Sequence, residues 1–493
     1  MERSSGILMP MSSLPSPYGI GTLGKAAYDF IDFLAAAGQS CWQLLPMSPP
    51  GMGNSPYSSY STFAGEIMYI DPELLVRDGL LLPGETEEYD WGSDPRRVDY
   101  DRVRQGRDAL LRRAFQRGFW LIKGKVTLFR RDNPWVDQYA LYMALKKHFD
   151  QKSWIDWPED ISYHRPEAVK EYSDLLRDEV DFYAFTQYLF YSQWNALRAY
   201  AREKGISFIG DLPIYVALDS ADVWSEPQFF MLDEKNNPVE VAGVPPDAFS
   251  EDGQLWGNPI YNYDAMRADG FGWWIRRMEG AGRLYDTVRI DHFRGMESYW
   301  AVKYGESTAR SGVWRKGPGM DLVGVLLSWF RDMHFIAEDL GVITDGVRQL
   351  LQDSGLPGMK VLQFGFDVNG ESDYMPHRCE ENSVCYIGTH DNETVKGWLE
   401  TTPEENISYA RKYMHITPDE GWCWGMIRAG MGCPAKLFVM QMQDVLELGR
   451  ECRTNTPGTL EGNWEWRMLP GETTEALREK LLDYTKTYRR TKI

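Results

Sequence analysis

The sequence predicts an α/β protein, a (β/α)8 TIM-type barrel with inserted subdomains on its catalytic face. Eight short apolar segments rich in β-branched and aromatic residues recur along the 493 residues, and helical patterns lie between several of them. Two of these segments end in an acidic residue, and a third is followed by one two residues later. Strands that alternate with helices form parallel sheets, and barrels of this class carry their reactive groups at the carboxyl ends of the strands.

The expected strands are brief and bounded by polar or turn-forming residues. In chain order they lie at residues 6–9, 42–46, 207–212, 287–291, 334–338, 359–364, 385–389 and 437–442. Residues 26–37 and 342–352 have the apolar spacing of helices, and glycines punctuate these patterns. We expect the eight strands to close into one barrel.

Unequal gaps between the strands predict insertions into a single catalytic barrel that spans residues 1–493. The gap after the second strand is too long for one crossover and holds helical stretches at 102–116 and 166–176 and a Trp-rich turn at 154–157. We therefore expect an inserted, mainly helical subdomain at 47–206. Residues 241–272, between the third and fourth strands, are rich in Gly, Pro and aromatic residues. We expect a lid or loop region there, because long loops in compact folds are usually functional.

Charge and composition exclude several classes of partner. Lys+Arg 53 against Asp+Glu 72 gives a formal net charge of −19, which repels phosphate backbones and anionic lipid. We expect no nucleic acid and no membrane among the partners, and a monomer. The N-terminal residues lack the apolar segment of a signal peptide, and no run approaches the ~18 apolar residues of a membrane span. The expected location is the cytoplasm.

Cysteine and histidine spacing indicates neither a disulfide framework nor a metal site. The six cysteines form no C-x-x-C pair and follow no regular spacing, so we expect free thiols. The seven histidines show none of the short ligand spacings typical of zinc, which disfavours a metal-dependent hydrolase. We expect no metal and no cofactor.

A glycine motif at residues 19–24 matches G-x-G-x-x-G and precedes a helical pattern. A dinucleotide site needs these glycines directly after a strand and an acid at the end of the next strand. Residues 12–18 separate the glycines from the first strand, and the strand at 42–46 has no acid at its end. The motif therefore indicates a loop whose backbone approaches a ligand or a neighbouring loop closely.

The acids at the strand ends gain meaning from their neighbours, because a lone Asp after a strand is more often a helix cap. Arg289 and Asp291 are two apart on a strand and share a face, and a cation beside a carboxylate keeps it ionised. Glu338 ends the next acidic strand, where existing negative charge favours its protonated form. Together with Asp391 they fit an enzyme that breaks glycosidic bonds through a carboxylate pair.

Eight motifs, in order from end to end, resemble the amylomaltase or 4-α-glucanotransferase (disproportionating enzyme) family of the α-amylase clan. They are SSLPS at 12–16, NSPY at 54–57, GDLPIY at 210–215, GVPPD at 243–247, RIDHFRG at 289–295, EDLG at 338–341, GTHDN at 388–392 and NWEWR at 463–467. The resemblance implies that Asp291 is the nucleophile and Glu338 the general acid and base. It implies that Asp391 holds sugar hydroxyls and stabilises the transition state.

The resemblance also implies a set of substrate-binding residues. Tyr57 is then a stacking platform at the bond that is cleaved, Gln254 and Trp256 lie on a lid loop, and Phe249 lies at its tip near acceptor sugars. The remaining members of the set are Asp211, Asp247, Arg289, His292, His390 and Asn463. Some relatives have an aromatic residue at a remote glucan contact where this chain has Met52, and Met stacks poorly on sugar.

We therefore expect a retaining transferase on α-1,4-glucans and maltooligosaccharides that uses carboxylates alone. The nearest alternative is an α-1,4-glucan hydrolase with the same residues, and the aromatic region at 241–272 favours transfer. A glucan-binding protein without activity is a further alternative. Such a protein needs aromatic residues but no placed acids.

Overall fold

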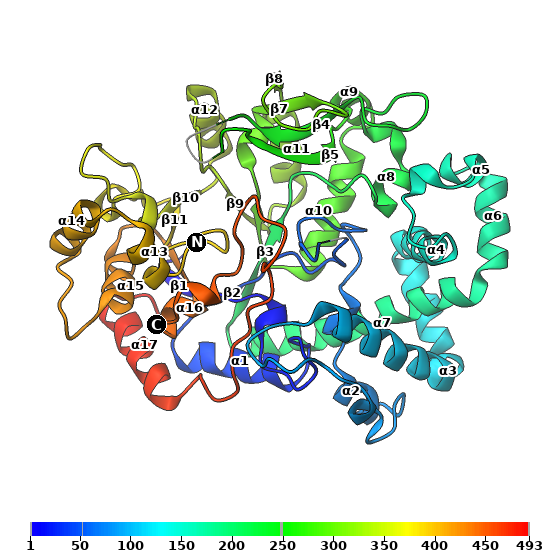
Figure 1. Cartoon of the computed structure of the whole chain (residues 1–493), viewed down its shortest axis with the longest axis horizontal. Helices are drawn as coiled ribbons and strands as arrows, with labels where there is room; N and C mark the ends of the chain where they lie inside the picture. The colour runs from blue at the N-terminus through cyan, green and yellow to red at the C-terminus, as the bar shows by residue number, and fades with distance from the viewer. Residues whose placement is uncertain (1, 52, 247–249, 492–493) are drawn as a thin grey trace.

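The computed structural model describes residues 2–51, 53–246 and 250–491 and contains an eight-stranded, all-parallel sheet (Figure 1). The strand order is β10-β11-β12-β1-β2-β3-β6-β9. The strands are β1 (Ser4–Leu8), β2 (Cys41–Gln43), β3 (Ser207–Leu212), β6 (Thr287–Ile290), β9 (His334–Ala337), β10 (Gly358–Val361), β11 (Ser383–Tyr386) and β12 (Leu437–Gln441). All eight expected strands are confirmed, with ends shifted by a few residues.

Two hydrogen bonds across the first and last strands of this order close the sheet into a barrel. Ala337 at the end of β9 donates its backbone N–H to the carbonyl of Pro357, just before β10, at 2.9 Å. The Asp339 side chain accepts the backbone N–H of Met359 in β10 at 2.6 Å. The Asp339 side chain therefore forms part of the barrel wall, whereas the preceding residue, Glu338, faces the site described below.

Alternation along the strands separates the barrel interior from its outer layer. Ile209, Ile336, Val384 and Val439 belong to one buried cluster with residues of β1, β2 and β10, which only the barrel lumen can bring together. Their neighbours in sequence, such as Phe208, Phe335 and Phe438, pack in the larger core that joins the strands to the helices. The core thus has the two layers expected of this fold.

Helices surround the barrel and follow most of its strands. They are α1 (Lys25–Ala36), α8 (Ala221–Ser225), α10 (Gly272–Leu284), α11 (Met320–Trp329), α12 (Asp345–Ser354), α13 (Val395–Thr401), α14 (Glu404–Met414), α15 (Trp422–Gly432), α16 (Met442–Val445) and α17 (Glu475–Thr487). The helix expected at 342–352 begins later, because the Thr344 side chain caps it by accepting the N–H of Val347.

The chain between β2 and β3 is mainly helical and lies to one side of the barrel (Figure 1). It contains α2 (Pro72–Arg77), α3 (Tyr100–Asp132), α4 (Trp135–His148), α5 (Glu159–Ser162), α6 (Pro166–Leu175) and α7 (Arg177–Glu203). The end of α7 returns to the barrel, where Trp194 packs on Phe208 of β3 with ring centroids 4.8 Å apart.

A second sheet stands above the barrel and has the antiparallel order β5-β4-β7-β8 (Figure 1). It consists of β4 (Glu240–Val244), β5 (Gln254–Pro259), β7 (Ser298–Lys303) and β8 (Val313–Lys316), and α9 (Tyr263–Ala268) follows β5. Residues 241–272, expected as a lid or loop region, contain most of β4 and the whole of β5 and α9. The strand β7, which pairs with β4, lies beyond β6 in the chain, so local periodicity cannot reveal the sheet.

The glycine motif is a close-packed loop, as expected. A Cβ atom on Gly21 would stand 1.8 Å from the carbonyl oxygen of Met11, so only glycine fits beside that neighbouring turn. None of the six cysteines forms a disulfide. Among the described residues, no helix has the length and apolar character needed to cross a membrane.

Candidate active site

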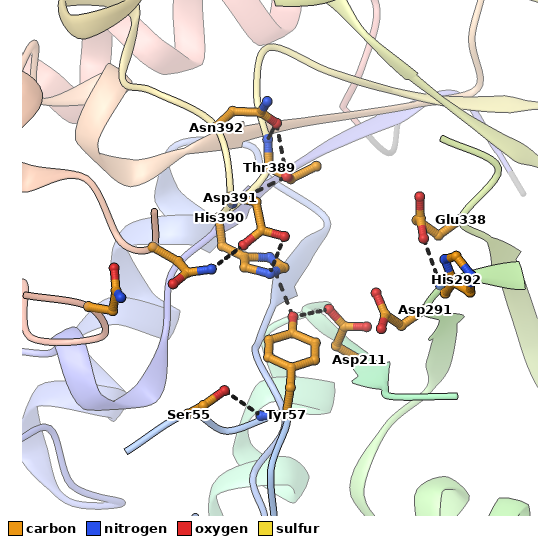
Figure 2. Close-up of polar contacts among 12 residues, drawn as sticks. Ser55, Tyr57, Asp211, Asp291, His292, Glu338, Thr389, His390, Asp391 and Asn392 are labelled. Atoms are coloured by element: carbon orange, nitrogen blue, oxygen red, sulfur yellow. Dashed lines mark hydrogen bonds and ion pairs between the residues drawn. The ribbon is translucent and has the colours of Figure 1, made fainter. Parts of the chain in front are cut away.

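The acids singled out in the sequence gather at the carboxyl ends of four barrel strands (Figure 2). Asp211 lies on β3, Asp291 directly follows β6, and Glu338 directly follows β9. Asp391 lies in the turn after β11. Figure 2 shows Asp211 and Asp291 between Glu338 on one side and the Tyr57, His390 and Asp391 group on the other.

Arg289 on β6 joins two of these acids. Its Nη1 donates to both carboxylate oxygens of Asp211, at 2.7 and 2.8 Å, and to Oδ1 of Asp291 at 3.1 Å. Arg289 and Asp211 are only 4% and 2% exposed, so the pair is an internal salt bridge. The shared strand face of Arg289 and Asp291 is confirmed.

Arg289 lowers the pKa of Asp291, in the expected direction, but does not bring it down to the ordinary value of a carboxyl group. The Asp291 side chain is 26% exposed, but desolvation by the surrounding protein and the charges of Asp211 and Asp391 raise its pKa to about 6, against the lowering effect of Arg289. Desolvation is the largest cause, and the guanidinium that opposes it is also shared with Asp211. Asp291 is still mainly ionised near neutral pH.

Glu338 is buried and has the higher pKa of the two acids, as expected. Burial and the negative charge of Asp291 raise the pKa of Glu338 to about 8, although Arg289 and two backbone N–H groups favour the ionised form. These donors are the N–H of His292 to Oε2 at 2.6 Å and of Leu340 to Oε1 at 3.0 Å. Near pH 7 this pair of acids therefore comprises one carboxylate, Asp291, and one carboxylic acid, Glu338.

Asp391 is held in its ionised form. Burial raises its pKa, but the charge and hydrogen bond of His390, 3.3 Å away, the hydrogen bond of Asn455 and the charge of Arg289 outweigh this effect and lower it to about 2. The Asn455 amide donates to Oδ1 at 2.6 Å. Arg453 donates to the backbone carbonyl of Asp391 at 2.5 Å. Asp391 can thus accept hydrogen bonds from a ligand without titrating.

Replacing Asn455 with Ala should lower kcat/KM by about 10- to 100-fold. One hydrogen bond to a charged group contributes about 1.5–3 kcal/mol, and each 1.4 kcal/mol is a factor of ten in rate. Asn455→Asp should cost more, because its carboxylate would repel Asp391. Initial rates and melting temperatures of both variants test this. Equal rates for both variants, or a loss explained by unfolding, would contradict the assigned contact.

Tyr57 lies at the centre of the site. Its hydroxyl donates to Oδ2 of Asp211 at 2.7 Å, and its ring stacks on His390 with centroids 5.1 Å apart and an interplanar angle of 18°. Trp464 flanks the same two rings at 5.8 and 5.9 Å. The neighbouring negative charge of Asp391 raises the pKa of His390 although burial lowers it. The structure thus places an aromatic ring among the carboxylates.

The second sheet reaches the site through Trp256. The Trp256 ring on β5 meets the His292 ring edge to face at 4.9 Å, and its Nε1–H donates to the Gln254 side chain at 3.2 Å. Burial lowers the pKa of His292 to about 3, so this ring is neutral. His292 has a left-handed backbone with φ 49°, which allows its N–H to face Glu338. His292 therefore contacts Trp256 through its ring and Glu338 through its backbone N–H.

Not every expected substrate residue points into the cleft. Both donors of the Asn463 amide go to Thr459, at 3.0 Å, and its oxygen accepts the N–H of Thr456 at 2.8 Å. The side chain thus holds its own loop and places the adjacent Trp464 against Tyr57. Asp247, Phe249 and Met52 lie outside the described residues.

Sequence reasoning missed Asn455 and Arg453, which support Asp391. They follow the short helix Arg450–Cys452 rather than a strand, so no strand-end signal marks them. The only sequence indication is that a polar, proline-containing loop precedes the 463–467 motif. Long-range contacts of this kind become visible only in the folded chain.

Known proteins resemble this chain over nearly its whole length. Residues 9–473 match the family model described as 4-alpha-glucanotransferase. The chain belongs to the 4-alpha-glucanotransferase family. Within this family, the 4-alpha-glucanotransferase of Clostridium butyricum is 44% identical over 485 residues, which cover 98% of this chain and 100% of that protein. The enzyme of Thermus thermophilus is 45% identical and covers 96% of each chain.

A solved relative has the same architecture over its full length. The amylomaltase from Streptococcus agalactiae, solved in complex with acarbose, superposes with a TM-score of 0.98 at 39% identity and covers 100% of both chains. The amylomaltase from Corynebacterium glutamicum shares the fold, with a TM-score of 0.76 at 19% identity over 99% of this chain and 75% of that one. The barrel is therefore the family's fold.

Proposed function

We propose that this 4-alpha-glucanotransferase moves segments of α-1,4-glucans or maltooligosaccharides from a donor to the 4-hydroxyl of an acceptor by a retaining double displacement. The observation that carries the proposal is the placement of Asp291 and Glu338 directly after the paired strands β6 and β9, with the pKa of Glu338, about 8, above that of Asp291, about 6. Members of the matched family are named as transferases, which favours transfer over the hydrolase alternative.

In the first step, the Asp291 carboxylate attacks the anomeric carbon of the donor. The bond to the glycosidic oxygen breaks, and the Glu338 proton moves to that oxygen. In the second step, Glu338 takes the proton of the acceptor hydroxyl, and the acceptor oxygen displaces Asp291 from the anomeric carbon. Each step inverts the configuration, so the product keeps the donor's anomeric form.

The remaining residues would hold the sugar between these two groups. Asp391 offers two carboxylate oxygens to sugar hydroxyls, and its low pKa keeps both available as acceptors. The Tyr57 ring offers an aromatic face at the cleaved bond, fixed by Asp211 and His390. Arg289 ties the nucleophile to β3 and limits its movement during attack.

We assign the 241–272 region to a lid that keeps water from the covalent intermediate, with Trp256 as its described contact. The product ladder from pure maltotriose tests the transferase and the lid together. The parent should give longer oligomers with few new reducing ends. Trp256→Ala should raise the ratio of hydrolysis to transfer. An excess of reducing ends in the parent would favour the hydrolase, and an unchanged ratio in the variant would contradict the lid.

The pKa order of the two acids predicts a bell-shaped pH profile for maltotriose transfer. The rate should fall as the pH drops through the pKa of Asp291, about 6, because the nucleophile must be ionised. It should also fall as the pH rises through the pKa of Glu338, about 8, because the acid must keep its proton. Donor cleavage of a substrate with a good leaving group should lack the alkaline fall. A fall of the same size for both donors would contradict the assignment.

Residues 47–206 are proposed as an inserted, mainly helical subdomain after β2. No metal and no cofactor takes part in the proposed chemistry. The monomeric state, the cytoplasmic location and the absence of nucleic-acid and membrane partners stay predictions.

A further inference from the structure

We propose that Cys379, Cys385 and Cys433 form a binding site for a thiophilic cation, zinc(II) or copper(I). This site takes no part in the sugar chemistry. The three sulfur atoms all lie within 4.8 Å of one another, and all three side chains are buried, at 4%, 0% and 2% exposure. The linear spacing of these residues suggests no metal site. The fold alone brings them together.

Three separate elements supply the sulfurs. Cys379 ends the short helix Pro376–Arg378, Cys385 lies on β11, and Cys433 follows α15. Cys385 belongs to the core outside the barrel, whereas its neighbours Val384 and Tyr386 face the lumen. Cys433 precedes β12, so the cluster lies toward the amino ends of the strands, opposite the carboxylates.

The chemistry of the set selects soft cations. Thiolate sulfur binds Zn²⁺ and Cu⁺ in preference to Mg²⁺ or Ca²⁺. Zinc–sulfur bonds are about 2.3 Å long, so sulfurs that share one ion lie about 4 Å apart. The observed separations are within reach of this arrangement. Among the described residues, no His, Asp or Glu joins the group, which distinguishes it from an oxygen-rich site.

A buried arginine supplies charge compensation. Arg490 is 0% exposed, and its Nη2 lies 3.6 Å from Sγ of Cys433. Arg3 donates to the backbone carbonyl of Cys433 at 2.8 Å. Three thiolates around Zn²⁺ leave one negative charge and around Cu⁺ two, which one or two neighbouring guanidinium groups offset. The Arg490 guanidinium is held in place by backbone carbonyls, among them those of Met431 and Ser4 at 2.8 Å, so its charge stays fixed beside the cluster.

Binding would release the thiol protons to solvent and form three metal–sulfur bonds, with no change of oxidation state. The ion would join the loop before β11 to the connection between α15 and β12. Its role would be to stabilise this side of the barrel, because ligands that bind only the folded state raise stability.

Metal analysis of the whole protein, purified under reducing conditions from zinc- or copper(I)-supplied cultures, tests the site. We expect about one equivalent of one of the two metals, and a lower melting temperature after the ion is removed. Cobalt(II) exchange should give a thiolate-to-cobalt charge-transfer band. The identity of the retained metal shows whether the site selects zinc(II) or copper(I).

Cys385→Ser and Cys379→Ser should both lose the metal and the cobalt band, while transfer activity per folded molecule stays near the parent value. The matched control is Cys423→Ser, a buried cysteine on the neighbouring helix α15 that is outside the cluster. It should keep the metal. No bound metal from either culture, equal loss in the control, or a disulfide found by mass analysis of the unreduced protein would overturn the proposal.

Discussion

Asp291→Asn should lower transfer from maltotriose by about 10⁴-fold or more, the scale seen when one member of a cooperating catalytic set is removed. The amide cannot form the covalent bond to the anomeric carbon. Its Oδ1 can still accept from Arg289, so the fold should persist. The measurement is the initial rate of disproportionation, with the melting temperature as a check on folding.

Asp339→Asn is the matched control for this variant. Asp339 is also an acid at a strand end, but its side chain accepts the N–H of Met359 in the barrel wall. An amide oxygen can keep that bond, so transfer should stay within about tenfold of the parent. If Asp291→Asn retained more than a tenth of parent turnover, or if both variants failed alike, Asp291 would not be the nucleophile.

Glu338→Gln should abolish transfer from maltotriose but still allow a donor with a good leaving group to react. An α-glucosyl fluoride needs no proton on its leaving group, so Asp291 can displace fluoride unaided. The second step then stalls, because no base activates the acceptor. The expected result is a protein that carries one glucosyl group on Asp291.

Peptide mass analysis after reaction with the fluoride locates this sugar. The same treatment of Asp291→Asn should leave the protein unlabelled, which makes it the control. A label on another residue, or none in Glu338→Gln, would contradict the roles assigned to both acids. A small azide anion, which attacks without a base, should release the sugar from the labelled variant.

Sequence patterns could predict the barrel and the acids because both follow from local order. A buried parallel strand reads as a short apolar run, and an acid directly after it lies at the carboxyl end of the barrel. Asp291 and Glu338 obey this rule. The two-residue spacing was enough to place Arg289 beside Asp291.

Other features depend on residues that meet only in the folded chain. The Arg289 guanidinium is shared because Asp211 comes from β3, so the pKa of Asp291 could not be judged from its own strand. Asn455 reaches Asp391 from a loop beyond β12. In the second sheet β4 pairs with β7, although β5 and β6 lie between them in the sequence. The three clustered cysteines likewise come from three different elements.

The two backbone N–H groups at Glu338 bear on its acid strength during the reaction cycle. In the resting acid, one carboxyl oxygen carries the proton, and its capacity to accept from His292 or Leu340 is reduced. Once the proton has left, both oxygens accept, and hydrogen bonds to a charged oxygen are about twice as strong as neutral ones. Burial thus retains the proton before cleavage, and the backbone stabilises the conjugate base afterwards. Glu338 is therefore a weak acid in the resting enzyme and a stronger acid during bond cleavage.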